Sequence, residues 1–89
     1  MTICRRCFVS GRVQGVFYRA TAGDRARSLG VSGHARNLDD GRVEVLACGA
    51  PEKVEEFIAW LWTGSSASRV DDVEVHEADG ESPAGFSTR

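Results

Sequence analysis

The feature that most constrains this chain is a strand that passes through a glycine-bracketed loop directly into a helix. Residues 3–10 (ICRRCFVS) predict the strand, and the segment GRVQGVFYR (residues 11–19) follows it. From Phe17 onward the pattern is helical as far as Gly30, which suits a left-handed helix end. Such a loop aims successive backbone N–H groups at one point, and the first helical turn adds unpaired donors and a positive dipole end. We therefore expect the segment to bind an anion.

Arg19 is placed in the first turn of that helix, beside the loop. Its planar guanidinium presents a fork of N–H donors that matches two oxygens of a phosphate group. The formal net charge of the chain is −2, which argues against a dedicated nucleic-acid binder because such proteins usually carry a basic face. Eight arginines nevertheless lie in the first half of the chain: Arg5, Arg6, Arg12, Arg19, Arg25, Arg27, Arg36 and Arg42. We therefore expect this half to bind a small anionic partner, and we expect no nucleic acid.

The rest of the chain continues the alternation of strands and helices. The expected elements are a strand over residues 31–38, the hairpin turn DDG at 39–41, a strand over 42–48, a helix over 51–64, a strand at 70–75 and a short edge strand at Phe86. This order predicts an α+β fold, the ferredoxin-like split βαβ sandwich (βαββαβ), with two helices on one face of an antiparallel sheet. One such domain is expected to span residues 1–89.

This topology carries a geometric prediction about two polar residues. Right-handed crossovers place the third strand between the first and the second. The loop after the first strand, the start of the first helix and the end of the second strand then fall at the same end of the sheet. Arg19 and Asn37 are therefore expected to converge there, although they are eighteen positions apart.

The three cysteines have different expected environments. Cys4 and Cys7 have the spacing of a metal or redox pair, but no second pair follows, and two residues so spaced in a strand point to opposite faces. The same alternation places Cys4 and Cys48 on the helix-free face, at strand ends that coincide in the expected pairing. Two alternatives remain open for this pair. Their expected proximity permits a disulfide, whereas a reducing cytoplasm favours two free thiols. Cys7 is expected to be a buried free thiol.

Two stretches of the sequence resemble the signatures of the acylphosphatases, small enzymes that hydrolyse carboxyl-phosphate bonds. GRVQGVFYR (residues 11–19) is similar to the first signature nearly position for position, and GHARNLDDGRV (residues 33–43) is similar to the second. The resemblance runs from about Cys4 to Leu61 and continues loosely through Val75. It implies a hydrolase that converts an acyl phosphate into a carboxylate and inorganic phosphate, without a cofactor.

The resemblance also implies roles for individual residues. Arg19 corresponds to the family's phosphate-binding arginine, and Asn37 corresponds to its water-orienting asparagine. The backbone amides that correspond to the phosphate cradle belong to Gln14, Gly15, Val16, Phe17 and Tyr18. An asparagine at the end of a strand can also simply bond to local backbone before a turn.

The chemistry of an acyl phosphate agrees with these assignments. Its carboxylate is already a good leaving group, so no strong general acid is required. Phosphoryl transfer passes through a loose transition state with charge on the equatorial oxygens, which N–H donors and one arginine can stabilise. The amide of Asn37 cannot act as a base, but its carbonyl oxygen can accept a hydrogen bond from water and orient it. We expect no metal ion and no covalent enzyme intermediate.

Three positions depart from the family's usual residues. Ala22 lies where a hydroxyl that props the loop is common, and Leu38 replaces a frequent threonine. His34 lies where an aromatic residue is common, and we expect it to be a surface histidine. These departures concern the rigidity of the loop and the rate rather than the reaction type. We also hypothesise that the carboxylate of Arg89 folds back onto Arg19.

Two other functions are compatible with the same fold. An RNA-binding module of the same fold needs aromatic residues on its central strands, where this chain offers only Phe8. A non-catalytic anion-binding or regulatory domain would retain the cradle without turnover. The sequence has neither an apolar run of membrane-spanning length nor an apolar stretch after Met1 suited to a signal peptide. A cytoplasmic monomer that does not associate with membranes is therefore expected.

Overall fold

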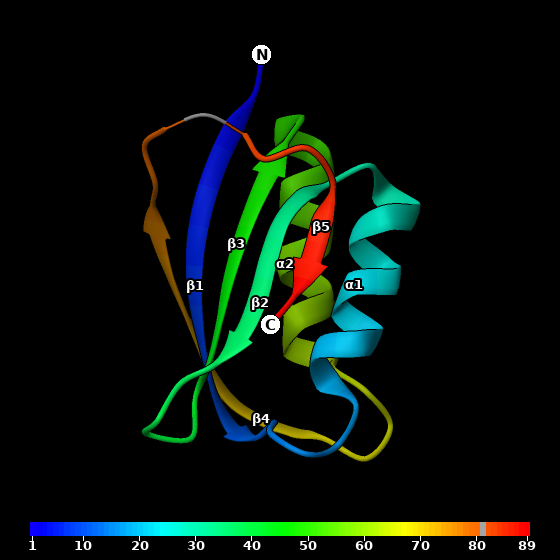
Figure 1. The fold of residues 1–89 in the computed structure, drawn as a ribbon, viewed down its shortest axis with the longest axis vertical. Coiled ribbons are helices and arrows are strands. Elements are labelled where there is room, and N and C mark those ends of the chain that lie inside the picture. The colour runs from blue at the N-terminus through cyan, green and yellow to red at the C-terminus, as the bar shows by residue number, and fades with distance from the viewer. Residues whose placement is uncertain (81) are drawn as a thin grey trace.

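The computed structural model describes residues 1–80 and 82–89. Its elements are β1 (Ile3–Arg12), α1 (Tyr18–Leu29), β2 (Ser32–Asn37), β3 (Val43–Gly49), α2 (Pro51–Thr63), β4 (Arg69–Glu77) and β5 (Phe86–Thr88). The strands form one sheet in the order β4-β1-β3-β2-β5, and both helices cover the same face of it (Figure 1). The expected ferredoxin-like α+β fold is confirmed, and β3 lies between β1 and β2 as the crossovers require.

The sheet is mixed rather than wholly antiparallel. The first four strands pair antiparallel, whereas β5 pairs parallel to β2, with Phe86 opposite Gly33. The chain leaves β4 at one edge of the sheet and reaches β5 at the other, so β5 runs in the same direction as β2 (Figure 1). The expectation of an antiparallel sheet thus holds for four strands, and the short strand at Phe86 adds a parallel edge.

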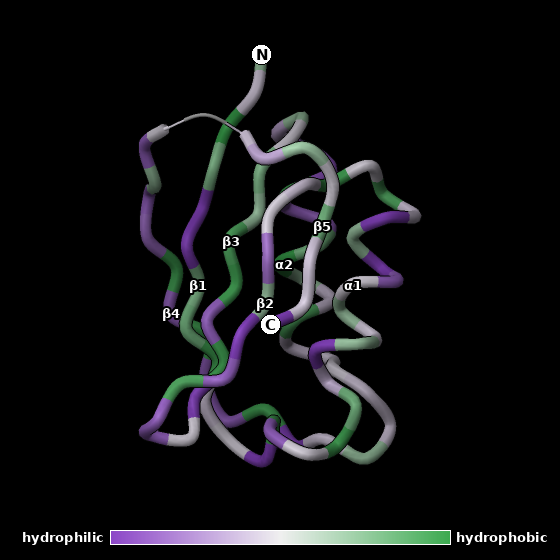
Figure 2. Tube along the Cα trace, in the orientation of Figure 1, coloured by the Kyte–Doolittle hydropathy of each residue, from purple (hydrophilic) through white to green (hydrophobic). Residues whose placement is uncertain are grey.

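The core lies between the sheet and the two helices. Helix α2 contributes the apolar stripe Val54, Phe57 and Leu61, all fully buried. Helix α1 is more polar (Figure 2) and buries mainly small residues, Ala22, Gly23 and Ala26, which let it lie close to the sheet. Within the described residues, no helix is long and apolar enough to span a membrane.

Strand β1 extends two residues further than the sequence pattern predicts. It passes through a β-bulge between Ser10 and Gly11 and continues to Arg12 beside β4. Gly11 has a φ of 127°, and a Cβ built on it would lie 2.2 Å from the backbone oxygen of Arg69. Gly11 therefore permits a close approach of two strands, and the loop begins only after Arg12.

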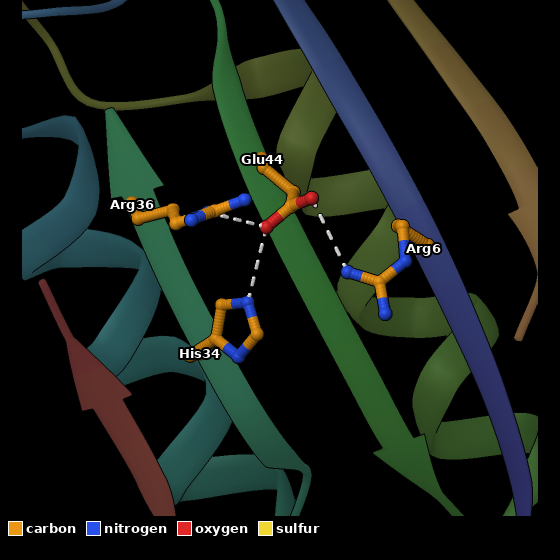
Figure 3. Close-up of polar contacts among 4 residues, drawn as sticks. All are labelled: Arg6, His34, Arg36 and Glu44. Atoms are coloured by element: carbon orange, nitrogen blue, oxygen red, sulfur yellow. Dashed lines mark hydrogen bonds and ion pairs between the residues drawn. The ribbon is translucent and has the colours of Figure 1, made fainter. Parts of the chain in front are cut away.

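The open face of the sheet carries an ion cluster centred on Glu44 (Figure 3). The carboxylate of Glu44 lies 2.7 Å from Nε of Arg36, 3.2 Å from Nη1 of Arg6 and 3.2 Å from Nε2 of His34. These four side chains come from β1, β2 and β3, so the cluster crosses three neighbouring strands. His34 is not the surface histidine expected, because its side chain is only 13% exposed against this carboxylate.

Two cysteines meet further along the same face. Cys4 and Cys48 are directly opposed in the register of β1 and β3, and their sulfur atoms are joined as a disulfide. Cys7 lies on the helix-covered face as a buried free thiol, as expected.

Candidate active site

The loop that joins β1 to α1 is shaped by two left-handed residues and two buried valines. Gly15 has a φ of 73° and Phe17 a φ of 62°. Val13 and Val16 point into the core and are almost fully buried. Because Val13 and Val16 are both held inward, the backbone between them is presented to the end of the sheet.

Hydrogen bonds to two other loops brace this segment, one set made by its own Gln14 side chain and one made by Ser65. The amide Nε2 of Gln14 donates to the carbonyl oxygens of Leu38 and Arg42, at 2.8 and 2.9 Å. The hydroxyl of Ser65, in the loop before β4, donates to the carbonyl oxygen of Val16 at 2.8 Å. Among the hydrogen bonds within residues 1–80 and 82–89, none is donated by a backbone amide from Gln14 to Tyr18. The loop is thus held through its carbonyls and one side chain, which leaves its N–H groups able to bind an anion.

Hydrogen bonds to backbone carbonyl oxygens also anchor the first turn of α1. The hydroxyl of Tyr18 donates to the carbonyl oxygen of Leu61 on α2 at 2.7 Å, and burial raises its pKa well above the usual value. The carbonyl oxygen of Phe17 accepts two hydrogen bonds from Thr21, one from the backbone at 3.0 Å and one from the hydroxyl at 2.8 Å. Thr21 thus supplies a hydroxyl brace next to Ala22, which is fully buried.

Arg19 lies beside a cavity of about 300 Å³ at this end of the fold. The cavity is lined by Val13, Gly15, Phe17, Tyr18, Arg19, Ala20 and Thr88. The guanidinium of Arg19 donates to the backbone oxygen of Arg89, which is the expected contact between these two residues. Strand β5 therefore contributes to the site from its position beside β2.

Asn37 lies at the same end of the sheet but does not line this cavity. It is the last residue of β2, exposed and paired with Val43 of β3. Figure 1 shows that β2 ends at the end of the sheet where α1 begins, as the topology predicts. The link between Gln14 and the carbonyl of Leu38 ties the loop to the residue that follows Asn37.

Some residues at this site carried no signal that the sequence pattern could reveal. Thr88 lies in a strand of three residues, and Ser65 lies in a loop rich in serine. Their proximity to the loop depends on the tertiary arrangement alone. The hydrogen bonds of the Gln14 side chain likewise depend on where the hairpin between β2 and β3 lies in the folded protein.

Comparison with known proteins agrees with this geometry. The family model for acylphosphatase matches residues 5–88. An acylphosphatase of Halorhodospira halophila is 55% identical over 82 residues, which cover 92% of this chain and 89% of that protein. One from Chromohalobacter salexigens is 51% identical over 83 residues, covering 93% of this chain and 92% of that protein.

Solved structures show the same relationship. The crystal structure of acylphosphatase from Bacillus subtilis superposes with a TM-score of 0.94 at 37% identity, covering 100% of this chain and 99% of that one. An acylphosphatase from Coxiella burnetii gives the same TM-score at 35% identity, covering 99% of this chain and 93% of that one. The family model covers residues 5–88 and both relatives are more than 50% identical over most of the chain, so this chain belongs to the acylphosphatase family, whose members hydrolyse the carboxyl-phosphate bond of acyl phosphates.

Proposed function

We propose that this chain hydrolyses acyl phosphates by in-line attack of a water molecule on a phosphate held by the β1–α1 loop. The phosphate-binding groups are the guanidinium of Arg19 and the backbone amides of Gln14, Gly15, Val16, Phe17 and Tyr18. The observation that carries this proposal is the braced loop, whose amides are free at a helix N-terminus beside a cavity lined by Arg19. Donors fixed in advance can stabilise charge that develops in the transition state without reorganising.

The reaction needs little beyond positioning. A water oxygen forms a bond to phosphorus while the bond from phosphorus to the acyl oxygen breaks, and the electron pair of that bond leaves with the carboxylate. One water proton moves to a phosphate oxygen, so the products are a carboxylate and dihydrogen phosphate. Because the transition state is loose, the charge to be stabilised sits on the equatorial oxygens that face Arg19 and the loop.

Asn37 is proposed to orient the attacking water. Its side-chain carbonyl can accept a hydrogen bond from that water, whereas the amide is not basic enough to remove a proton. Support comes from its exposed position at the end of β2 and from the tie between Gln14 and the neighbouring Leu38. In this scheme the Gln14 side chain fixes the distance between the phosphate-binding loop and the end of β2, where Asn37 lies.

Hydrolysis of acetyl and benzoyl phosphate in the presence of EDTA tests the proposal. Arg19→Gln should weaken inhibition by inorganic phosphate and lower kcat/KM by about 10²–10³-fold, because it removes a charged donor from the transition state. Asn37→Ala should lower kcat by about 10²-fold or more and leave inhibition by phosphate unchanged, because only the water loses its position. Arg25→Gln is the matched control, since Arg25 lies on the exposed side of the same helix in contact with Glu56.

Three results would contradict the proposal. Full activity in both variants would remove Arg19 and Asn37 from the mechanism. Loss of activity on addition of EDTA would show that a metal ion takes part. Phosphate binding without turnover in the wild type would instead indicate a non-catalytic anion-binding or regulatory domain.

We further propose that residues 1–89 act as one domain and as a monomer in the cytoplasm. The five strands share a single sheet, and most of the buried apolar residues described form one core cluster. Sedimentation equilibrium should give the mass of one chain, and a dimer mass at micromolar concentration would overturn the monomer. Fractionation of cells that express the tagged chain tests the compartment.

A further inference from the structure

Phe17 presents a large apolar side chain to solvent at the site. It is 80% exposed and lines the same cavity as Arg19. Its chain neighbours Val16 and Tyr18 are buried. The alternation places the benzyl group of Phe17 outside the core, although burial is the usual state of such a group.

The backbone of Phe17 holds it there in a conformation that bulky residues rarely adopt. Within the described residues it is the single non-glycine residue with a positive φ, at 62°. A left-handed conformation is an outlier for a bulky side chain and tends to occur where a site requires it. Both hydrogen bonds from Thr21 to the carbonyl of Phe17 hold the peptide in this orientation.

The cavity has room and apolar surface for more than a phosphate. Its volume of about 300 Å³ reaches the lower end of the range that holds small organic ligands. Val13, Phe17, Tyr18 and Ala20 line it together with the polar residues Arg19 and Thr88. Phe17 and Arg19 line the same cavity, so the acyl group of a substrate whose phosphate is bound at Arg19 would lie close to Phe17.

We infer that Phe17 contacts the acyl group of the substrate and makes the site prefer aromatic or bulky apolar acyl phosphates to acetyl phosphate. The inference rests on the proposed function, because it assumes that the phosphate is held at Arg19. An aromatic acyl group can pack against the ring of Phe17 in an offset or edge-to-face arrangement, and this contact removes apolar area of both partners from water. A methyl group is too small to reach the same contact.

The test compares kcat/KM for benzoyl phosphate with that for acetyl phosphate in three variants. In Phe17→Gly, which suits the left-handed backbone, the ratio of the two values should fall about tenfold, the change expected for loss of an apolar contact. In Phe17→Leu it should fall by less, and in Phe17→Trp it should stay near the wild-type ratio. Trp62→Leu is the matched control, because Trp62 is an exposed aromatic residue that does not line the cavity.

A second measurement needs no turnover. The wild type should bind benzylphosphonate about tenfold more tightly than methylphosphonate in a calorimetric titration, and Phe17→Gly should bind the two alike. An unchanged substrate ratio in Phe17→Gly, with turnover retained, would overturn this inference alone. Selective binding of benzylphosphonate by a wild type that hydrolyses neither substrate would overturn the proposed hydrolysis and leave this inference standing. Equal binding of both phosphonates by the wild type would overturn the inference.

Discussion

At the scale of single residues, the carboxylate of Glu44 has lost nearly all contact with water, since the residue is 6% exposed. Burial by itself raises its pKa, but hydrogen bonds from Arg36 and His34 and the charges of Arg36 and Arg6 outweigh that effect, so the pKa lies below its usual value. A carboxylate with a lowered pKa in the folded state stabilises the fold above its unfolded pKa, about 4.3 for glutamate. That contribution is lost as the pH falls through the folded pKa.

Replacing Glu44 by glutamine should therefore destabilise the protein in a pH-dependent way. At pH 7 we expect the free energy of unfolding to fall by about 1–3 kcal/mol, because hydrogen bonds to a charged acceptor are lost. Near pH 3 the difference from the wild type should shrink, since the wild-type carboxylate is then becoming protonated. Urea unfolding at both pH values measures this.

Glu74→Gln is the control for Glu44→Gln. Glu74 is on the same face of the sheet and pairs with His76, but both side chains are more than half exposed. Exposed pairs of this kind contribute little, so no measurable change is expected. A Glu44→Gln effect of equal size at both pH values would contradict the role given to the charged form.

At the scale of elements, the site depends on a contact between a loop and a hairpin. Gln14 supplies both hydrogen bonds between them, and the carbonyls that accept these bonds lie at Leu38 and Arg42, on either side of the turn. The backbone amide of Leu38 also donates to the carbonyl of Arg42 at 2.8 Å, which closes the hairpin. Beyond the pairing of the strands, one side chain and a closed turn thus tie the segment after Asn37 to the β1–α1 loop.

Gln14→Ala should lower both the stability of the protein and its turnover. Loss of two neutral hydrogen bonds should lower the free energy of unfolding by about 1–3 kcal/mol. The value of kcat should fall about 10²-fold, because small displacements of positioning groups have effects of that order. Inhibition by phosphate should change less than kcat, since the loop retains the brace from Ser65.

Ser28→Ala serves as a comparison for Gln14→Ala, because its hydroxyl also bonds to a carbonyl, that of Arg25, on the exposed side of α1. Its kcat should match the wild type. Equal kcat in Gln14→Ala and the wild type would show that the hairpin does not need this link.

Elements with a strong periodic pattern could be predicted from the sequence, and contacts between loops could not. Val54, Phe57 and Leu61 recur at helical spacing, and all three are buried in α2 as that pattern requires. The topology also predicted that Arg19 and Asn37 lie at one end of the sheet. The sequence predicts that β1 ends at Ser10, because a glycine at position 11 suggests the start of a loop. In the structure β1 continues to Arg12, and Gly11 is needed because the backbone of Arg69 approaches it closely. The brace from Ser65 depends on packing between segments far apart in the chain, which local patterns do not encode.

At the scale of the whole molecule, one covalent link joins the two central strands. The disulfide between Cys4 and Cys48 has a sequence separation of 44, and a loop of that length restricts the unfolded chain considerably. The chain-entropy treatment gives about 4 kcal/mol of stabilisation for such a loop. The thiol of Cys7 does not readily undergo thiol–disulfide exchange with this link. Cys7 is buried on the other face of the sheet, and burial raises the pKa of its thiol to about 11.

Thiol counting and unfolding under two redox conditions check this link. Protein purified without reductant should show one reactive thiol after denaturation and none before it, because Cys7 is buried and protonated at pH 8. Addition of reductant should give three thiols and lower the free energy of unfolding by about 2–4 kcal/mol. Cys4→Ser with Cys48→Ser should show one thiol and have the stability of the reduced protein in either condition. Three thiols in the unreduced protein would contradict the link.

The order of the strands in the sheet also affects how quickly the protein becomes active. Strand β1 lies between β3 and β4, and Arg5 near its start pairs with Glu77 near the end of β4. Chains whose pairings join distant segments lose much entropy before those contacts form, so they cross their folding barrier slowly. Strand β5 brings Thr88 to the cavity by pairing with β2, far along the chain from the β1–α1 loop. The complete cavity therefore forms only once this distant strand has docked, and the appearance of activity should lag behind the formation of helix during refolding.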